Sequence, residues 1–121
     1  MTKLWTQTMV REAVFSIDKG IRVAAEVIVQ KRHLESAKQI VLDSGYPYEI
    51  TDLSESHVSI TVVKTPYLGR VFQALTAWQC SDIAVKHWCW GKFFGYGNTE
   101  IQEFINKECP DPTLLPGNQK V

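Results

Sequence analysis

The sequence predicts an α+β fold with an N-terminal antiparallel sheet, one intervening helix and then a C-terminal helical segment. In the first half, short runs alternate apolar and polar residues as strands do, and after residue 65 apolar residues recur at helical spacing. The chain has 121 residues, 45% of them hydrophobic, which suffices for one core. We therefore expect a single domain over residues 1–108. Prolines and a glycine crowd residues 109–121, which predicts an irregular tail.

The first two expected strands form a hairpin. Residues 14–17 make a short apolar run, and residues 21–29 place an apolar residue at every second position, so these residues share one face of a strand. Asp18, Lys19 and Gly20 between them suit a three-residue turn that Gly20 closes in the left-handed conformation. A helix across residues 22–31 is the alternative, and the β-branched residues of this run disfavour it.

Turn-forming residues delimit the elements that follow. Residues 33–44 carry one apolar stripe and predict a helix that Gly45 caps and Pro47 prevents from resuming. Residues 48–51 and 58–63 predict two strands separated by a polar turn.

Three helices then follow in the second half. Thr65 and Pro66 start the first, and residues 83–94 follow Ser81 and Asp82. The last begins near Asn98, where Thr99 and Gln102 have the spacing of a capping box. We expect all of the helices, including the one over residues 33–44, to gather on one face of the sheet.

Charge and cysteine content limit the function. The 13 basic and 13 acidic residues give a net charge of zero, whereas general nucleic-acid binders carry a basic excess. Cys80, Cys89 and Cys109 lack paired spacing, so we expect reduced thiols and a cytoplasmic location. No stretch approaches the roughly 20 apolar residues of a membrane span, so we expect no membrane partner.

The sequence contains no phosphate-binding loop, no dinucleotide-binding glycine pattern and no nucleophile elbow. Its three histidines, His33, His57 and His87, lie far apart, and no Cys-x-x-Cys is present, so we expect no metal site. Cys89 and His87 are two apart on one helix and point in different directions. We therefore predict a binding protein without a cofactor. An enzyme whose site follows no known motif is an alternative.

Residues 86–98 carry the most informative pattern, with five aromatic residues among thirteen. At about 100° per residue, Trp90 and Phe94 share one helix face, whereas Trp88 lies on roughly the opposite side with Lys92 one turn further on. Trp88 must therefore meet another helix, a second subunit or a ligand. An aromatic ring beside a cation suits a planar ring that carries phosphates.

The end of this stretch suits ligand contacts as well. Tyr96 offers a second ring for stacking, and Asn98 and Thr99 open the last helix, where free amides would bind an anion. Arg22, on the second face of its strand, could meet a phosphate or a partner chain, or be solvated or paired with a neighbour. The alternatives for the aromatic cluster are an ordinary core, since large aromatic residues dominate core burial, and a protein-binding patch of an inhibitor or assembly factor.

The chain resembles the phage-encoded anti-Thoeris sponge proteins in its small size, its neutral charge and its order of strands followed by helices. Trp88, and Asn98 ten residues further on, are the local residues that carry the resemblance. Members of that family sequester cyclic ADP-ribose-type signals without degrading them. The resemblance implies that Trp88 stacks on adenine, that Asn98 is a polar contact, and that the chain is a symmetric homo-oligomer with ligand near its subunit contacts. That family leans on arginines for phosphates, and none of the four arginines here follows the aromatic cluster.

Overall fold

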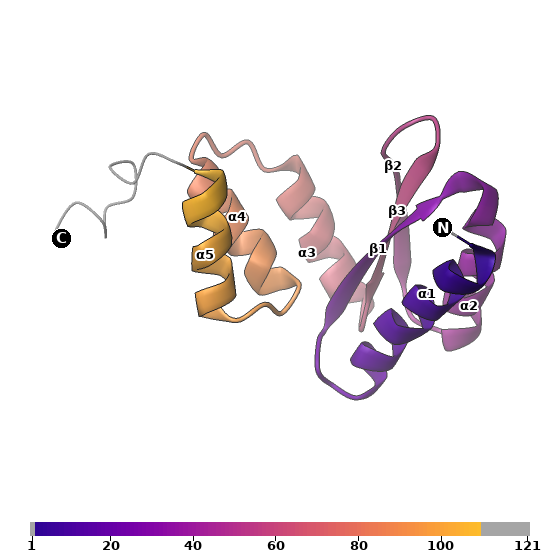
Figure 1. The fold of residues 1–121 in the computed structure, drawn as a ribbon. Coiled ribbons are helices and arrows are strands. Elements are labelled where there is room, and N and C mark those ends of the chain that lie inside the picture. The colour runs from indigo at the N-terminus through magenta and orange to yellow at the C-terminus, as the bar shows by residue number, and fades with distance from the viewer. Residues whose placement is uncertain (1, 110–121) are drawn as a thin grey trace, which may run out of the picture.

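The computed structural model describes residues 2–109, and the predicted tail beyond Cys109 lies outside the described residues. The α+β class is confirmed (Figure 1). The elements, in chain order, are α1 (Lys3–Asp18), β1 (Ala24–Gln30), the short 3-10 helix η1 (Lys31–His33), α2 (Leu34–Ser44), β2 (Tyr48–Asp52), β3 (His57–Val63), α3 (Pro66–Ala77), α4 (Ile83–Phe93) and α5 (Asn98–Glu108). None of the helices among these residues is both long and apolar enough to span a bilayer.

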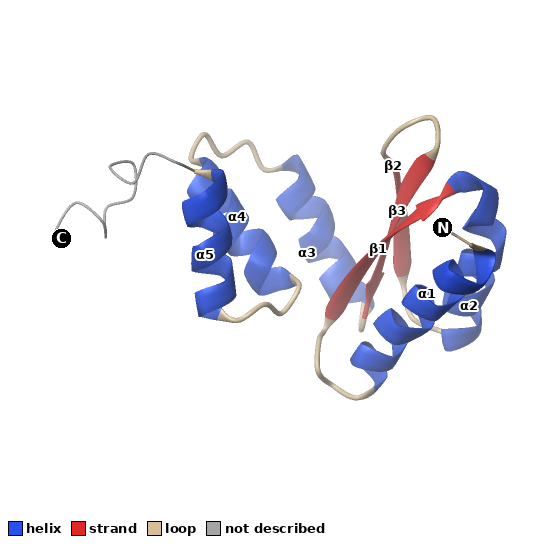
Figure 2. Ribbon diagram, viewed as in Figure 1, coloured by secondary structure: helices blue, strands red, loops and turns tan. Residues whose placement is uncertain are grey.

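The sheet has three strands in the order β1-β3-β2, and both pairings are antiparallel. Figure 2 shows α1 and α2 together against one side of these strands. The main core lies between them, where Val27 of β1 and Ile60 of β3 stand opposite each other and pack with Val10 of α1 and Val41 of α2. The predicted period-two face of residues 21–29 is therefore confirmed for Ala25, Val27 and Val29, which are all buried.

The expectation that the helices gather on one face is wrong, because α3 packs on the opposite face of the sheet. Ala24 and Val63, which pair directly across β1 and β3, form a second core there with Phe72 of α3 and Phe93 of α4. The second face is apolar at this end of the sheet, so a further helix layer can bury it. The α4–α5 pair lies beyond α3, on the far side from α1 and α2 (Figure 1).

The predicted hairpin over residues 14–29 is also wrong, because residues 3–18 form a helix. Gly20 does adopt the expected left-handed backbone, with φ +71°, but it ends α1. Its N–H donates to the Ile17 carbonyl at 3.1 Å, and the Ile21 N–H donates to the Ser16 carbonyl at 2.9 Å. This is the Schellman pattern of a helix C-terminus. A hairpin turn and a helix cap both need a residue with positive φ, so glycine alone does not distinguish them.

Most of the other predicted boundaries hold. Gly45 caps α2 with φ +80°, and Pro66 stands in the first turn of α3. Asp82 caps α4 by accepting from the N–H groups of Ala84 and Val85. The capping residue of α5 differs from the prediction, because Gly97 is its N-cap and Thr99 lies inside the helix.

Candidate functional site

The C-terminal helices α4 and α5 pack unusually close together at one point. A Cβ built on Gly91 would lie 2.6 Å from Cγ1 of Ile101 on α5, a distance that real side chains do not tolerate. Gly91 stands in the interior of α4, where glycine normally weakens a helix. The close approach accounts for the glycine, since only a residue without Cβ lets Ile101 sit over the α4 backbone.

The end of α4 fixes the position of Tyr96. Gly95 has φ +80°, its N–H donates to the Lys92 carbonyl at 3.1 Å, and the Tyr96 N–H donates to the Gly91 carbonyl at 2.9 Å. This second Schellman cap confirms that the segment 95–97 stops the helix. The cap turns the chain so that the Tyr96 ring stands at the end of α4.

A pocket of about 350 Å³ lies between the two helices, and we call it the α4–α5 pocket. Its lining is mostly aromatic or apolar, with three titratable side chains. The lining residues are His87, Trp90, Gly91, Phe94, Tyr96, Glu100, Ile101 and Phe104. Such a volume falls within the range of about 300–1000 Å³ common for small-molecule sites, and such sites are lined mainly by apolar groups with a few polar ones.

The rings of the pocket hold one another in fixed geometry. Trp90 stacks on Phe94 with centroids 5.8 Å apart and planes 16° apart, and the His87 ring meets Phe104 edge to face at 4.9 Å. Trp90 also meets Phe72 of the second core edge to face at 5.4 Å. The wall formed by Trp90 and Phe94 is therefore anchored in the core, whereas Phe104 on α5 is 48% exposed.

One charged side chain, Glu100, lines this pocket, and a second, Arg22, contacts one of its lining rings. One carboxylate oxygen of Glu100 accepts from the Gly97 N–H at 3.3 Å, which leaves its second oxygen as an acceptor. The guanidinium carbon of Arg22 lies 5.4 Å from the centroid of the Tyr96 ring, in cation–π range. Arg22 thus reaches from the start of β1 to the aromatic ring at the end of α4.

The predicted ligand residues fall into two separate groups. Tyr96 lines the α4–α5 pocket, and Arg22, which lines a separate groove between α1 and β1, contacts the Tyr96 ring. Trp88, Lys92 and Asn98 form the other group, with the Lys92 ammonium 5.2 Å from the centroid of the Trp88 ring and hydrogen-bonded to the Asn98 side-chain oxygen. The predicted aromatic–cation pair is therefore present.

Trp88 lines a different and smaller hollow of about 230 Å³, which we call the Trp88 hollow. Its other lining residues are Ala84, Val85, Gln102, Ile105 and Asn106. Trp88 is 37% exposed, so its own chain does not enclose it. Trp88 and Tyr96 therefore line different hollows.

The start of α5 differs from the anion site that the sequence suggests. Glu100 folds back onto the Gly97 N–H, so a carboxylate of the chain itself already stands at this helix start. Thr99 is exposed and lines neither the α4–α5 pocket nor the Trp88 hollow. A phosphate at this position would be repelled by that carboxylate.

Sequence reasoning missed most of the α4–α5 pocket. The sequence predicts that Trp90 and Phe94 share one face of the helix. In the structure His87 and Gly91 continue that stripe, and Glu100 and Phe104 face it from α5. The signal was available within each helix, because His87, Trp90, Gly91 and Phe94 recur at intervals of three and four residues. The pairing of the two stripes needs the tertiary fold.

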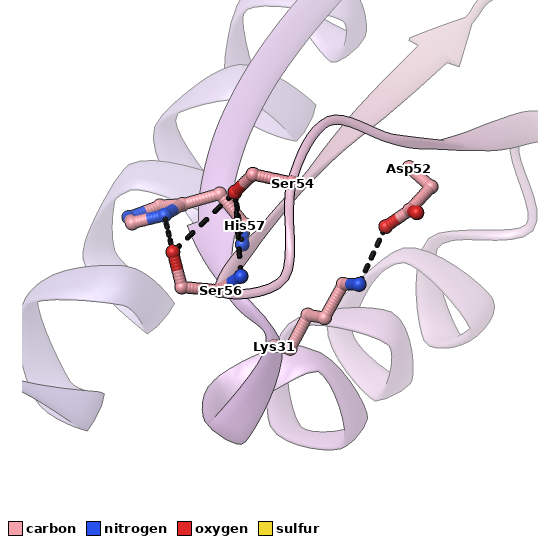
Figure 3. A network of polar contacts seen from close by, with 5 residues as sticks. All are labelled: Lys31, Asp52, Ser54, Ser56 and His57. Atoms are coloured by element: carbon pink, nitrogen blue, oxygen red, sulfur yellow. Dashed lines mark hydrogen bonds and ion pairs between the residues drawn. The ribbon is translucent and has the colours of Figure 1, made fainter.

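Figure 3 shows a polar network at the β2–β3 turn. It contains serine, histidine and aspartate, the residue types of a hydrolytic triad, but not the contacts of one. The Ser56 hydroxyl lies 2.6 Å from Nδ1 of His57, and the Ser54 hydroxyl accepts from the backbone N–H of His57 at 3.2 Å. Asp52 forms its ion pair with Lys31 at 2.6 Å. Within the residues drawn in Figure 3, no carboxylate contacts the imidazole, as a catalytic triad requires. The network shapes the turn and ties it to the end of β1.

The three cysteines are free thiols. Over the described part of the chain, no three His, Cys, Asp or Glu side chains gather where they could hold a metal ion. Comparisons of the chain with models of protein families, with curated proteins and with solved structures found no match.

Proposed function

We propose that this protein is a non-catalytic binding protein that sequesters a small nucleotide-derived molecule, with the planar base held in the α4–α5 pocket. The observation that carries the proposal is the pocket itself, an aromatic-lined hollow of about 350 Å³ between two helices. A flat heteroaromatic ring gains both apolar burial and offset or edge-on ring contacts in such a site.

The charged groups at the pocket favour a nucleotide over a plain hydrocarbon. The free oxygen of Glu100 can accept from the exocyclic amine of a base, because an ionised carboxylate acts only as an acceptor. The Arg22 guanidinium lies beside Tyr96 and suits a phosphate oxygen, which it can bind with two N–H groups. The base contact would thus come from Glu100 in the pocket lining and the phosphate contact from Arg22 on the Tyr96 ring.

The roles of these polar groups support binding without catalysis. His87 packs its ring against Phe104, and Glu100 is bonded to the start of α5. Neither contact pairs the side chain with a nucleophile or with a second acid–base group. Sequestration follows as the function, since a molecule that is bound and not converted is withdrawn from its receptor.

Calorimetry of the purified chain against a panel of linear and cyclic nucleotides tests the proposal. We expect one class of nucleotide to bind, and heating the complex should release that nucleotide chemically intact. Release of an altered molecule would support the enzyme alternative, and failure of every nucleotide to bind would contradict the proposal.

A protein-binding inhibitor is the second candidate, and the outer face of α1 favours it. Leu4, Trp5 and Phe15 are large apolar side chains on that helix, and each is more than half exposed. Exposed aromatic residues of this kind are enriched at protein interfaces. A complex that is lost on Trp5→Ser and kept on Phe104→Ala would favour this candidate over nucleotide binding.

A further inference from the structure

One charge dominates the polar lining of the α4–α5 pocket. Among the described residues that line it, Glu100 alone carries a carboxylate, and none carries an ammonium or guanidinium group. The volume of about 350 Å³ lies near the lower limit of small-molecule sites, which is about 300 Å³. A base that fills so small a pocket comes into contact with its polar lining. The carboxylate of Glu100 therefore selects among the bases.

The position of this carboxylate is set by contacts at the start of α5. One oxygen of Glu100 accepts from the Gly97 N–H at 3.3 Å, and a Cβ on Gly97 would lie 3.3 Å from the same oxygen. Glycine thus leaves room for the carboxylate. The next residue, Ile101, packs over Gly91 and holds the start of α5 against α4. A carboxylate has about four lone-pair sites on its two oxygens, so Glu100 can accept further bonds from a ligand.

A group that only accepts hydrogen bonds distinguishes the bases by their donors. Adenine and cytosine place one amino group beside a ring nitrogen that is an acceptor, and uracil places a single N–H between two carbonyl oxygens. Guanine is the common base with two adjacent donors, its N1–H and its N2 amino group. A carboxylate can bond both donors at once. Against the other bases, one of its oxygens meets a lone pair, which repels it.

We propose that the α4–α5 pocket selects guanine, with Glu100 accepting from the N1–H and the N2 amino group of the base. This inference rests on the proposed function, because it names the base of the nucleotide that the pocket holds. The O6 atom beside N1 is an acceptor, and His87 brings an N–H donor to the same lining. Guanine differs from the adenine that the resemblance to the sponge proteins implies.

Calorimetry with nucleotides that differ only in the base tests this selection. GMP has both donors, IMP keeps N1–H and lacks the amino group, and AMP has an acceptor at N1; each is used in linear and in 3′,5′-cyclic form. We expect the guanine nucleotide to bind about tenfold or more tightly than the adenine nucleotide, with inosine between them, the difference typical of a hydrogen bond to a charged group. Because Glu100 is exposed, water competes with these bonds, and the discrimination stays below that of a fully buried site.

Glu100→Gln tests whether this side chain makes the selection. Glutamine keeps an oxygen for the Gly97 N–H and replaces the other oxygen by an amino group, which faces the two donors of guanine. An amide with one donor and one acceptor instead pairs well with adenine. The ratio of guanine to adenine affinity should therefore fall by about tenfold or more. Glu103→Gln makes the same change further along α5, outside the pocket lining, and should leave the ratio unchanged.

The outcomes separate base selection from nucleotide binding itself. Adenine bound as tightly as guanine, or a ratio that Glu100→Gln leaves unchanged, would overturn the selection of guanine and leave the proposed function in place. If none of these nucleotides binds, guanine selection is overturned, and only failure of the wider panel as well would contradict the proposed function. Thermal unfolding verifies that each variant folds. If Glu100→Gln does not fold, the order of affinities in the wild-type chain still decides.

Discussion

The guanidinium of Arg22 lies over the ring of Tyr96, 5.4 Å from its centroid. This contact joins the start of β1 to the end of α4, two segments that are more than seventy positions apart in the sequence. Arg22 also packs its side chain against the backbone of Gly95, where an added Cβ would lie 3.5 Å from its Cγ. Arg22 therefore connects the residues before β1 to a ring that lines the α4–α5 pocket.

Two helical glycines should respond to alanine with opposite signs. Gly91→Ala should destabilise the fold by about 1–3 kcal/mol, because the new Cβ would lie 2.6 Å from Ile101 and overpack the α4–α5 contact. Gly69→Ala in α3 should stabilise by about 0.5–1 kcal/mol through helix propensity, since its Cβ would meet only Val63 at 3.9 Å. Urea unfolding of the wild-type chain and both variants measures these changes in the free energy of unfolding. A stabilised Gly91→Ala would show that α4 and α5 are not in close contact.

The N-cap residue of α4, Asp82, should contribute more to the stability of the fold than Thr65, the N-cap residue of α3. Asp82 accepts from the Ala84 and Val85 N–H groups at 3.0 and 3.3 Å, so Asp82→Ala should cost about 0.5–2 kcal/mol. Thr65 makes no side-chain capping bond, so Thr65→Ala should change stability by less than about 0.5 kcal/mol. Thermal unfolding compares the two, and equal losses would be inconsistent with the capping geometry.

Tyr46 should make the stability of the fold fall as the pH becomes alkaline. Its hydroxyl donates to a carboxylate oxygen of Asp18, and this bond, with partial desolvation and the nearby negative charge, raises the tyrosine pKa above its ordinary value. A raised pKa means that the bond stabilises the fold fully below about pH 10, the ordinary tyrosine pKa, and is lost as the pH rises through the higher value of the folded state.

Tyr46→Phe measures this contribution. The melting temperature of the wild-type chain should exceed that of the variant at neutral pH, and the difference should vanish at strongly alkaline pH. A difference that stays constant through the titration would contradict a bonded phenol. Spectrophotometric titration of tyrosinate should show the loss of the tyrosine with the raised pKa.

The sequence predicts the three strands and helices α2 to α5 because their boundaries depend on local chemistry. Gly45, Pro66 and Asp82 end or begin helices by backbone conformation and capping bonds that involve neighbouring residues only. The first helix was missed because Val14, Phe15 and Ile17 also favour strands. Its buried stripe includes Thr6, a polar residue whose hydroxyl donates to the Thr2 carbonyl, so the helical period was hidden.

The candidate site was predicted only in part for a related reason. The positions of Trp88 and Lys92 on one helix face follow from spacing, and the structure brings them together. Which face of α4 opens onto a pocket depends on where α3 and α5 pack, and Phe104 meets His87 from seventeen positions away. Spacing within a single helix contains no information about that packing.

Binding by two matched variants tests the central claim most directly. Phe104→Ala removes one exposed wall of the α4–α5 pocket, and Trp88→Ala removes a similarly exposed ring from the Trp88 hollow of the same two helices. With the nucleotide that binds the wild-type chain, calorimetry should show affinity lowered about tenfold or more by Phe104→Ala, the loss expected for one ring contact. Trp88→Ala should leave the affinity unchanged. Lost binding in Trp88→Ala with full binding in Phe104→Ala would contradict the assignment of the ligand to the α4–α5 pocket.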